Sequence, residues 1–88
     1  MQYRKKPVTI EAIQYTGTPE SNREIIDWTK DSGTPAYMDT NGNDEKQLSI
    51  NTLEGAHWVI KGDFIIKGVK GEFYPCKPDI FELTYDKV

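Results

Sequence analysis

The chain has 88 residues and a formal net charge of −3 at pH 7. This charge argues against indiscriminate binding to a long polyanion such as nucleic acid, although a local basic cluster can still hold a small anion. Hydrophobic residues make up 36% and aromatic residues 11% of the chain, which excludes a disordered tail. A chain this short buries only about 60–65% of the surface that its unfolded form exposes, so its core is thin and self-association would help to stabilise it.

The cysteine content and the apolar runs indicate a cellular setting. Cys76 is the only cysteine, which excludes a disulfide within the chain and a cysteine-rich zinc site. No apolar run approaches the roughly 18 residues that a membrane helix needs, and no apolar stretch of signal-peptide length follows the basic residues near the N-terminus. We therefore expect a soluble protein that stays in the reducing cytoplasm where it is made.

The first predicted element is a strand over VTIEAIQYT, residues 8–16, which Pro7 opens. Apolar residues alternate with polar ones up to Ala12, and from Ile13 onward they fall on the opposite face. This change of phase predicts either a bulge near Ala12 and Ile13 or a strand that is covered on both faces.

A helix is predicted at about 19–32, with Gly33 ending it. It begins either with Thr18 ahead of a proline or with a capping box in which Glu24 follows Ser21. Its apolar stripe is narrow and consists of Ile25, Ile26 and Trp28. We expect this helix to lie on a sheet with its other side in water.

Short strands and turns dominate the rest of the chain. AYMDT and KQLSINT, residues 36–40 and 46–52, flank Asn41 and Gly42, which tolerate positive φ and so predict a hairpin. Three further reversals, at 54–55, 61–62 and 68–71, predict a small meander whose strands are 56–60, 63–67 and 72–76.

The C-terminal segment PDIFELTY, residues 78–85, is either a short helix with Pro78 at its first position or an edge strand, and we favour the helix. The chain has no internal repeat, linker or low-complexity tract. Together these elements predict one α+β domain over residues 1–88, with a small, mainly antiparallel sheet of hairpins.

Residues that could support catalysis do not form a constellation. His57 lacks an orienting partner, and Cys76 follows Pro75 in an apolar setting where a buried thiol is more common than a nucleophile. The acidic residues at turns, Asp39, Asp44, Glu45 and Asp63, lack the spacing of a calcium loop. We expect no catalytic residue, no metal site and no cofactor.

Two basic clusters could bind an anion. Gly68 to Gly71, with Lys67 and Lys70, could expose backbone N–H groups to a phosphate, but a plain hairpin turn is favoured because a Walker loop is longer and leads into a helix. Arg4, Lys5 and Lys6 form the second cluster, which a solvated edge explains about as well.

Both ends of the chain resemble a known group of proteins. YRKKPVTIEAIQYTG, residues 3–17, and GDFIIKGVKGEFYPCKPDIFELTY, residues 62–85, are similar to small accessory proteins of tailed phages and prophages, of the PGDYG-like type. Those proteins usually carry Pro-Gly-Asp-Tyr at a turn where this chain has Lys61-Gly62-Asp63-Phe64. The resemblance implies a non-catalytic protein acting in the cytoplasm of an infected bacterial host.

It further implies a role against host defence, as in the anti-CBASS sponges that sequester cyclic nucleotide signals in a homo-oligomer (dimer or tetramer). A cyclic dinucleotide needs a few cations and stacking faces, and its pseudo-twofold shape suits a site between symmetric subunits. For that ligand we predict phosphate contacts from Arg4, Lys5, Lys67 and Lys70 and stacking on Tyr3, Trp58 and Tyr74.

Two alternatives stay open. The first is a protein-binding module that inhibits or docks on a host protein through a sheet edge and exposed aromatics. The second, less supported, is a compact enzyme acting on nucleotides.

Overall fold

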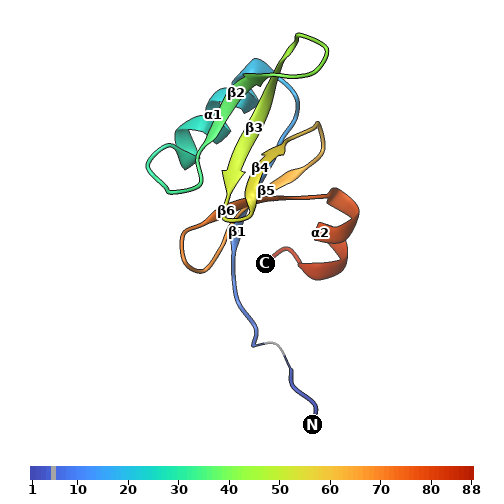
Figure 1. Ribbon diagram of the computed structural model, residues 1–88. Coiled ribbons are helices and arrows are strands. Elements are labelled where there is room, and N and C mark those ends of the chain that lie inside the picture. The colour runs from blue at the N-terminus through green and yellow to red at the C-terminus, as the bar shows by residue number, and fades with distance from the viewer. Residues whose placement is uncertain (5) are drawn as a thin grey trace.

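The computed structural model describes residues 1–4 and 6–88 and contains two antiparallel three-stranded sheets and two helices (Figure 1). Sheet A has the strand order β1-β5-β6 and consists of β1 (Glu11–Gln14), β5 (Phe64–Lys67) and β6 (Phe73–Cys76). Sheet B has the order β2-β3-β4 and consists of β2 (Ala36–Thr40), β3 (Lys46–Thr52) and β4 (Gly55–Trp58). The helices are α1 (Pro19–Thr29) and α2 (Pro78–Thr84). The predicted α+β class is confirmed, and the strands divide between two sheets.

The change of phase in the apolar pattern of β1 predicted either a bulge or a strand covered on both faces, and the structure has the second. The register of β1 with β5 runs without interruption from Glu11 opposite Lys67 to Gln14 opposite Phe64, so the predicted bulge is wrong. Both faces of the strand are instead covered. Ile13 packs against the main core, while the half-buried Ala12 faces the C-terminal segment on the other side.

α1 has Thr18 as its N-cap, which is one of the two predicted helix starts. The Thr18 hydroxyl accepts the Ser21 N–H at 3.1 Å, which satisfies one of the free donors at the helix start. The helix ends at Thr29, before the predicted boundary. The buried Thr29 hydroxyl donates to the Ile25 carbonyl at 2.9 Å and accepts the Ala36 N–H at 2.8 Å, which fixes β2 against the end of the helix.

The β2–β3 hairpin forms where it is predicted, but by a different turn chemistry. Neither Asn41 nor Gly42 has positive φ, and the one left-handed residue of this turn is Asp44 at φ 61°. The Asn41 side-chain oxygen accepts the N–H groups of Asn43 at 2.8 Å and of Glu45 at 3.1 Å. Asn41 therefore closes the turn with its side chain.

Sheet A lies between two apolar layers. Ile13, Ile65 and Phe73 share a core with residues of α1 and sheet B, and Trp28 of α1 meets Phe73 edge-on at a centroid distance of 4.8 Å. On the opposite face, Phe81 of α2 stacks on Phe64 at 3.9 Å. The C-terminal segment is thus a helix, as favoured from the sequence, and it covers the outer face of sheet A.

An ion pair between a buried carboxylate and a half-exposed lysine joins the Lys61-Gly62-Asp63 turn to the start of α2. The Asp63 carboxylate is 2% exposed, accepts the Ile60 N–H at 3.1 Å and pairs with the Lys77 Nζ at 3.1 Å. Gly62 adopts φ 99°, which explains the glycine at this turn.

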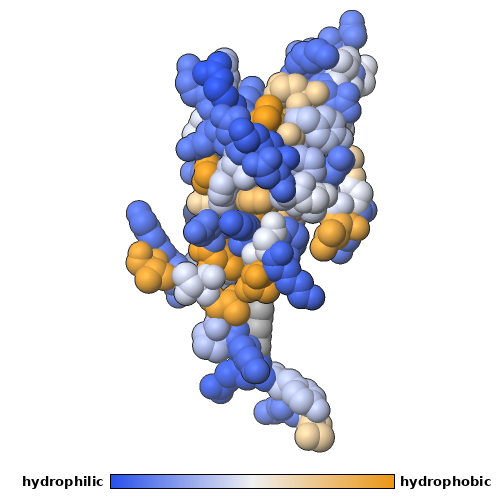
Figure 2. Space-filling model, turned by 90° about the vertical axis from the view of Figure 1, so that its left-hand side faces the viewer, coloured by the Kyte–Doolittle hydropathy of each residue, from blue (hydrophilic) through white to orange (hydrophobic). Residues whose placement is uncertain are grey.

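The outer surface is mixed in polarity. On the face shown in Figure 2, apolar side chains form small separate patches, and the upper part of the body is largely hydrophilic. Neither helix in the described ranges, 1–4 and 6–88, has the length and apolar character that crossing a membrane requires.

Candidate functional site

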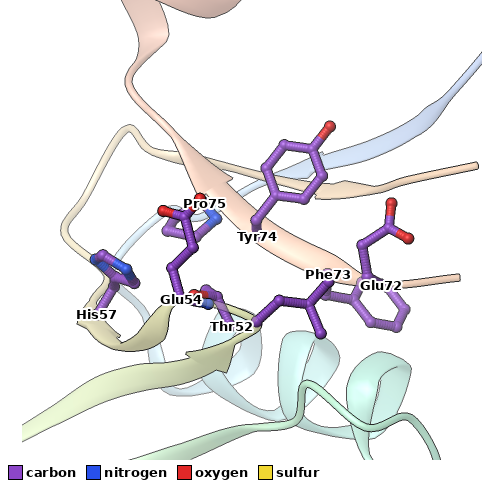
Figure 3. Close-up of a pocket in the computed structure, with 8 residues that line it drawn as sticks. Thr52, Glu54, His57, Glu72, Phe73, Tyr74 and Pro75 are labelled. Carbon is purple, nitrogen blue, oxygen red and sulfur yellow. Dashed lines mark hydrogen bonds between the residues drawn. The ribbon is translucent and has the colours of Figure 1, made fainter. Parts of the chain in front are cut away.

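A surface pocket of about 310 Å³ opens between the β3–β4 turn and β6. Figure 3 shows the Glu54 side chain reaching from the hairpin toward Pro75 of β6, whereas the Tyr74 and Glu72 side chains extend from β6 away from the hairpin. Its lining combines apolar, acidic and aromatic side chains, namely Thr52, Leu53, Glu54, His57, Glu72, Phe73, Tyr74 and Pro75.

The β3–β4 turn presents one side of the pocket. The Thr52 hydroxyl donates to the Gly55 carbonyl at 2.8 Å, and its oxygen also accepts the Glu54 N–H at 3.1 Å. These bonds hold the two turn residues outward, and Leu53 is 80% exposed. Leu53 thus adds apolar surface to the lining of the pocket.

β6 presents the other side and is held by a long-range hydrogen bond. The Phe73 N–H donates to the Thr34 hydroxyl at 2.7 Å, which ties the outer edge of β6 to the α1–β2 connection. Phe73 is buried below the pocket, whereas Figure 3 shows Tyr74 leaving the strand on the opposite side.

Glu72 is the least satisfied polar group of the pocket. Its side chain lies over Gly68, where an added Cβ would collide with the carboxylate. Its Oε2 atom is buried and has no hydrogen-bond partner among residues 1–4 and 6–88. A buried carboxylate oxygen without a donor costs free energy, so a cationic or N–H group brought here would gain a strong partner.

The charges of the lining favour a cation. Glu54 and Glu72 carry negative charge, and no lysine or arginine of the described residues lines the pocket. Burial, followed by a hydrogen bond with Tyr85 and by nearby negative groups, raises the pKa of Tyr74 to about 12, so its hydroxyl stays neutral at ordinary pH. Burial also raises the pKa of the nearby Cys76 thiol, with Asp63 and Asp79 adding to the shift.

The structure does not bring the predicted phosphate and stacking residues together within one chain. Tyr3 and Arg4 lie on an N-terminal arm that leaves the body (Figure 1), and Lys5 lies outside the described residues. Lys67 and Lys70 flank the β5–β6 turn. Trp58 pairs with Ser49 on β3 and lies on the face of sheet B opposite to the core residue Ile50. Of the members of this set that the structure describes, only Tyr74 lines the pocket.

The β5–β6 turn is a hairpin, as favoured from the sequence, and its backbone is already engaged. The Gly71 N–H donates to the Gly68 carbonyl at 3.0 Å, and the Gly68 N–H donates to the Glu72 carbonyl at 2.7 Å. These N–H groups are not available to cradle a phosphate. The carboxylate of Glu72 beside the turn, and Glu11 opposite Lys67 in the ladder, further weaken its attraction for an anion.

Sequence reasoning missed most of the pocket residues. The Glu54-Gly55 reversal was predictable, but nothing in the sequence indicates that this turn lies against β6, because that approach depends on how the two sheets pack. Within the part of the chain that the structure describes, no group of three His, Cys, Asp or Glu side chains is placed to hold a metal ion.

Comparison of the chain with protein-family models, curated proteins and solved structures gives no match. The resemblance to phage accessory proteins stays a prediction.

Proposed function

We propose that this protein is a non-catalytic protein-binding module whose pocket takes a lysine or arginine side chain from an extended segment of a partner protein. The apolar residues Leu53, Phe73 and Pro75 suit the aliphatic stem of such a side chain. Glu54 and Glu72 supply the countercharge, and a charge-assisted hydrogen bond would satisfy Glu72.

The observation that carries this proposal is the apolar and acidic lining of the pocket, which includes Glu54 and Glu72 and no lysine or arginine of the described residues, together with the buried, unpartnered Oε2 atom of Glu72. The same charges disfavour a phosphodiester in this pocket.

The cyclic nucleotide sponge remains a second proposal, supported by the basic residues Arg4, Lys67 and Lys70 and by the resemblance to phage proteins. Because these residues lie on separate parts of the protomer, such a site needs an oligomer that brings the arm of one subunit to the hairpin of another. In either case the setting we propose is the cytoplasm of an infected bacterial host.

The test is an NMR titration with short, end-capped extended peptides that differ at one central residue: lysine, arginine, norleucine or glutamate. We expect the lysine and arginine peptides to shift amide signals around the pocket, and the other two to bind much more weakly. Salt should weaken the binding, as it does for exposed charge pairs.

Three variants locate the site. Glu54→Gln and Glu72→Gln should each weaken binding several-fold, while Glu82→Gln, an exposed change on α2 away from the pocket, should leave it unchanged. Equal binding of the norleucine and lysine peptides would contradict the proposal. A thermal-shift panel of cyclic di- and trinucleotides runs in parallel, and stabilisation there that is lost in Lys67→Glu would favour the sponge.

A further inference from the structure

β4 is the exposed edge of sheet B. The strand order β2-β3-β4 leaves one side of β4 without a neighbouring strand among the described residues, and all four of its residues are exposed. Exposed strand edges are templates for pairing, and proteins usually block them.

The register shows which backbone groups of β4 are available. The Val59 N–H donates to the Leu48 carbonyl at 2.9 Å, and His57 lies opposite Ile50 in the same ladder. In an antiparallel ladder, alternate residues direct their N–H and C=O groups to the same neighbour. His57 therefore bonds to β3, while Ala56 and Trp58 direct their backbone groups away from it.

Other edges of the two sheets are blocked by identifiable devices. On β6, Pro75 has no N–H, and the Phe73 N–H is taken by the Thr34 hydroxyl. On β2, the Ala36 N–H is taken by the Thr29 hydroxyl and the Thr40 N–H by the Asp39 carboxylate, so this edge is only partly blocked and leaves the Met38 N–H directed outward. β4 carries neither a proline nor a Lys, Arg, Asp or Glu residue, since its sequence is GAHW.

We propose that two copies of this chain join through their β4 edges, antiparallel, into one continuous six-stranded sheet with a two-fold axis at His57. In this register Ala56 of each copy lies opposite Trp58 of the other, and their outward N–H and C=O groups form four hydrogen bonds. The small Ala56 side chain leaves room for the indole of the partner's Trp58, which is 44% exposed in the single chain.

Two alternative registers of the β4–β4 pairing leave outward backbone groups of β4 unpaired. Pairing Trp58 with its own copy places two indoles opposite each other and leaves Ala56 beyond the paired region. Pairing Ala56 with its own copy leaves the outward groups of Trp58 unpaired. The register centred on His57 is thus the one that uses all outward groups of this short strand.

Such a dimer has a consequence for the pocket. His57 lines the pocket and lies on the two-fold axis, so the two pockets open on the same face of the dimer. A partner with repeated basic side chains would then bind both with an avidity that one copy lacks. This consequence rests on the function proposed above, whereas the dimer itself does not.

The test is the mass in solution, measured by sedimentation equilibrium up to about 0.5 mM, in the range of weak specific association. We expect a species of twice the protomer mass of 10.1 kDa. Ala56→Pro removes an outward N–H without removing a bond to β3, and should raise the dimer dissociation constant at least about tenfold. Trp58→Ala should weaken the dimer in the same direction.

Met38→Pro is the matched control, because Met38 also directs its N–H outward, on the opposite edge of sheet B; it should leave the dimer intact. Amide exchange gives a second readout: protection of Ala56 and Trp58 should rise with protein concentration, while that of His57 should not. A monomer at the highest concentration, or a dimer unaffected by Ala56→Pro, would overturn the proposal. Peptide binding by the monomeric Ala56→Pro variant would show that the pocket functions without the dimer, so the two proposals fail separately.

Discussion

Thr34→Val tests how strongly the pocket depends on one hydrogen bond. Thr34 is 2% exposed, and its hydroxyl accepts the N–H of Phe73, which is 3% exposed. Valine has nearly the same shape but no acceptor, so the Phe73 N–H would be buried without a partner. Leaving a buried donor unsatisfied costs about 1–3 kcal/mol, and we expect the free energy of unfolding to fall by that amount. For a domain of this size, each kcal/mol corresponds to about 4–8 °C in Tm.

Urea denaturation followed by tryptophan fluorescence measures this loss. Thr84→Val is the matched control, because the Thr84 hydroxyl bonds the Ile80 carbonyl at 2.8 Å in an exposed position where water can replace it. The control should change stability by less than about 0.5 kcal/mol. If Thr34→Val costs no more than the control, the bond does not hold β6, and the pocket geometry must have another cause.

Two further predictions concern the layer around α2. Lys77→Met should lower the free energy of unfolding by about 3 kcal/mol, the lower end of the range for a fully buried pair, because the Asp63 carboxylate is buried but the Lys77 side chain is 56% exposed and screened by water. Asp63→Ala should cost only about 1–3 kcal/mol, mainly through the unpaired Ile60 N–H, and the reverse order in urea denaturation would contradict this reasoning. The raised pKa of Tyr74, about 12 against an ordinary 10.0, means that the folded state holds this proton more tightly. Its stabilisation is fully present below pH 10 and lost as the pH rises toward 12, so Tm should fall across that window, and Tyr74→Phe should reduce the fall.

Local chemistry explains why much of the fold was predictable. The cap at Thr18, the turn at Gly62 and the proline at the start of α2 each act on residues close to them in the chain, and the structure has the corresponding feature at each of these positions. The first strand differs: it was predicted over residues 8–16, and β1 covers only Glu11–Gln14. The division into two sheets was not predictable, because β1 (Glu11–Gln14) pairs with β5 (Phe64–Lys67), which is distant along the chain. The change of phase at Ala12 and Ile13 did indicate that both faces of this strand are covered, although the same pattern was compatible with a bulge.

The pocket was harder to predict than the fold. Its acidic residues come from two turns that are distant in sequence, and each residue taken alone reads as a solvated charge. The lysines of the β5–β6 turn were more conspicuous, yet the carbonyls that occupy the glycine N–H groups appear only in the folded hairpin. Charge at a turn indicates a ligand only when the structure leaves a group there unsatisfied, as it does at Glu72.

β4 takes part in both proposals, the dimer and the pocket, because alternate residues of a strand point their groups in different directions. Its outward backbone groups, at Ala56 and Trp58, lie in the plane of the sheet, while the side chain of His57 faces the pocket. Changes at Ala56 should therefore alter association and leave binding of a single basic side chain intact, and changes at Glu54 should do the opposite. A variant that combines changes at Ala56 and Glu54 measures the coupling between association and peptide binding. If both pockets of a dimer bind one partner, the losses of binding free energy should be additive for a peptide with one lysine. For a peptide with two lysines, the combined loss should be more than additive.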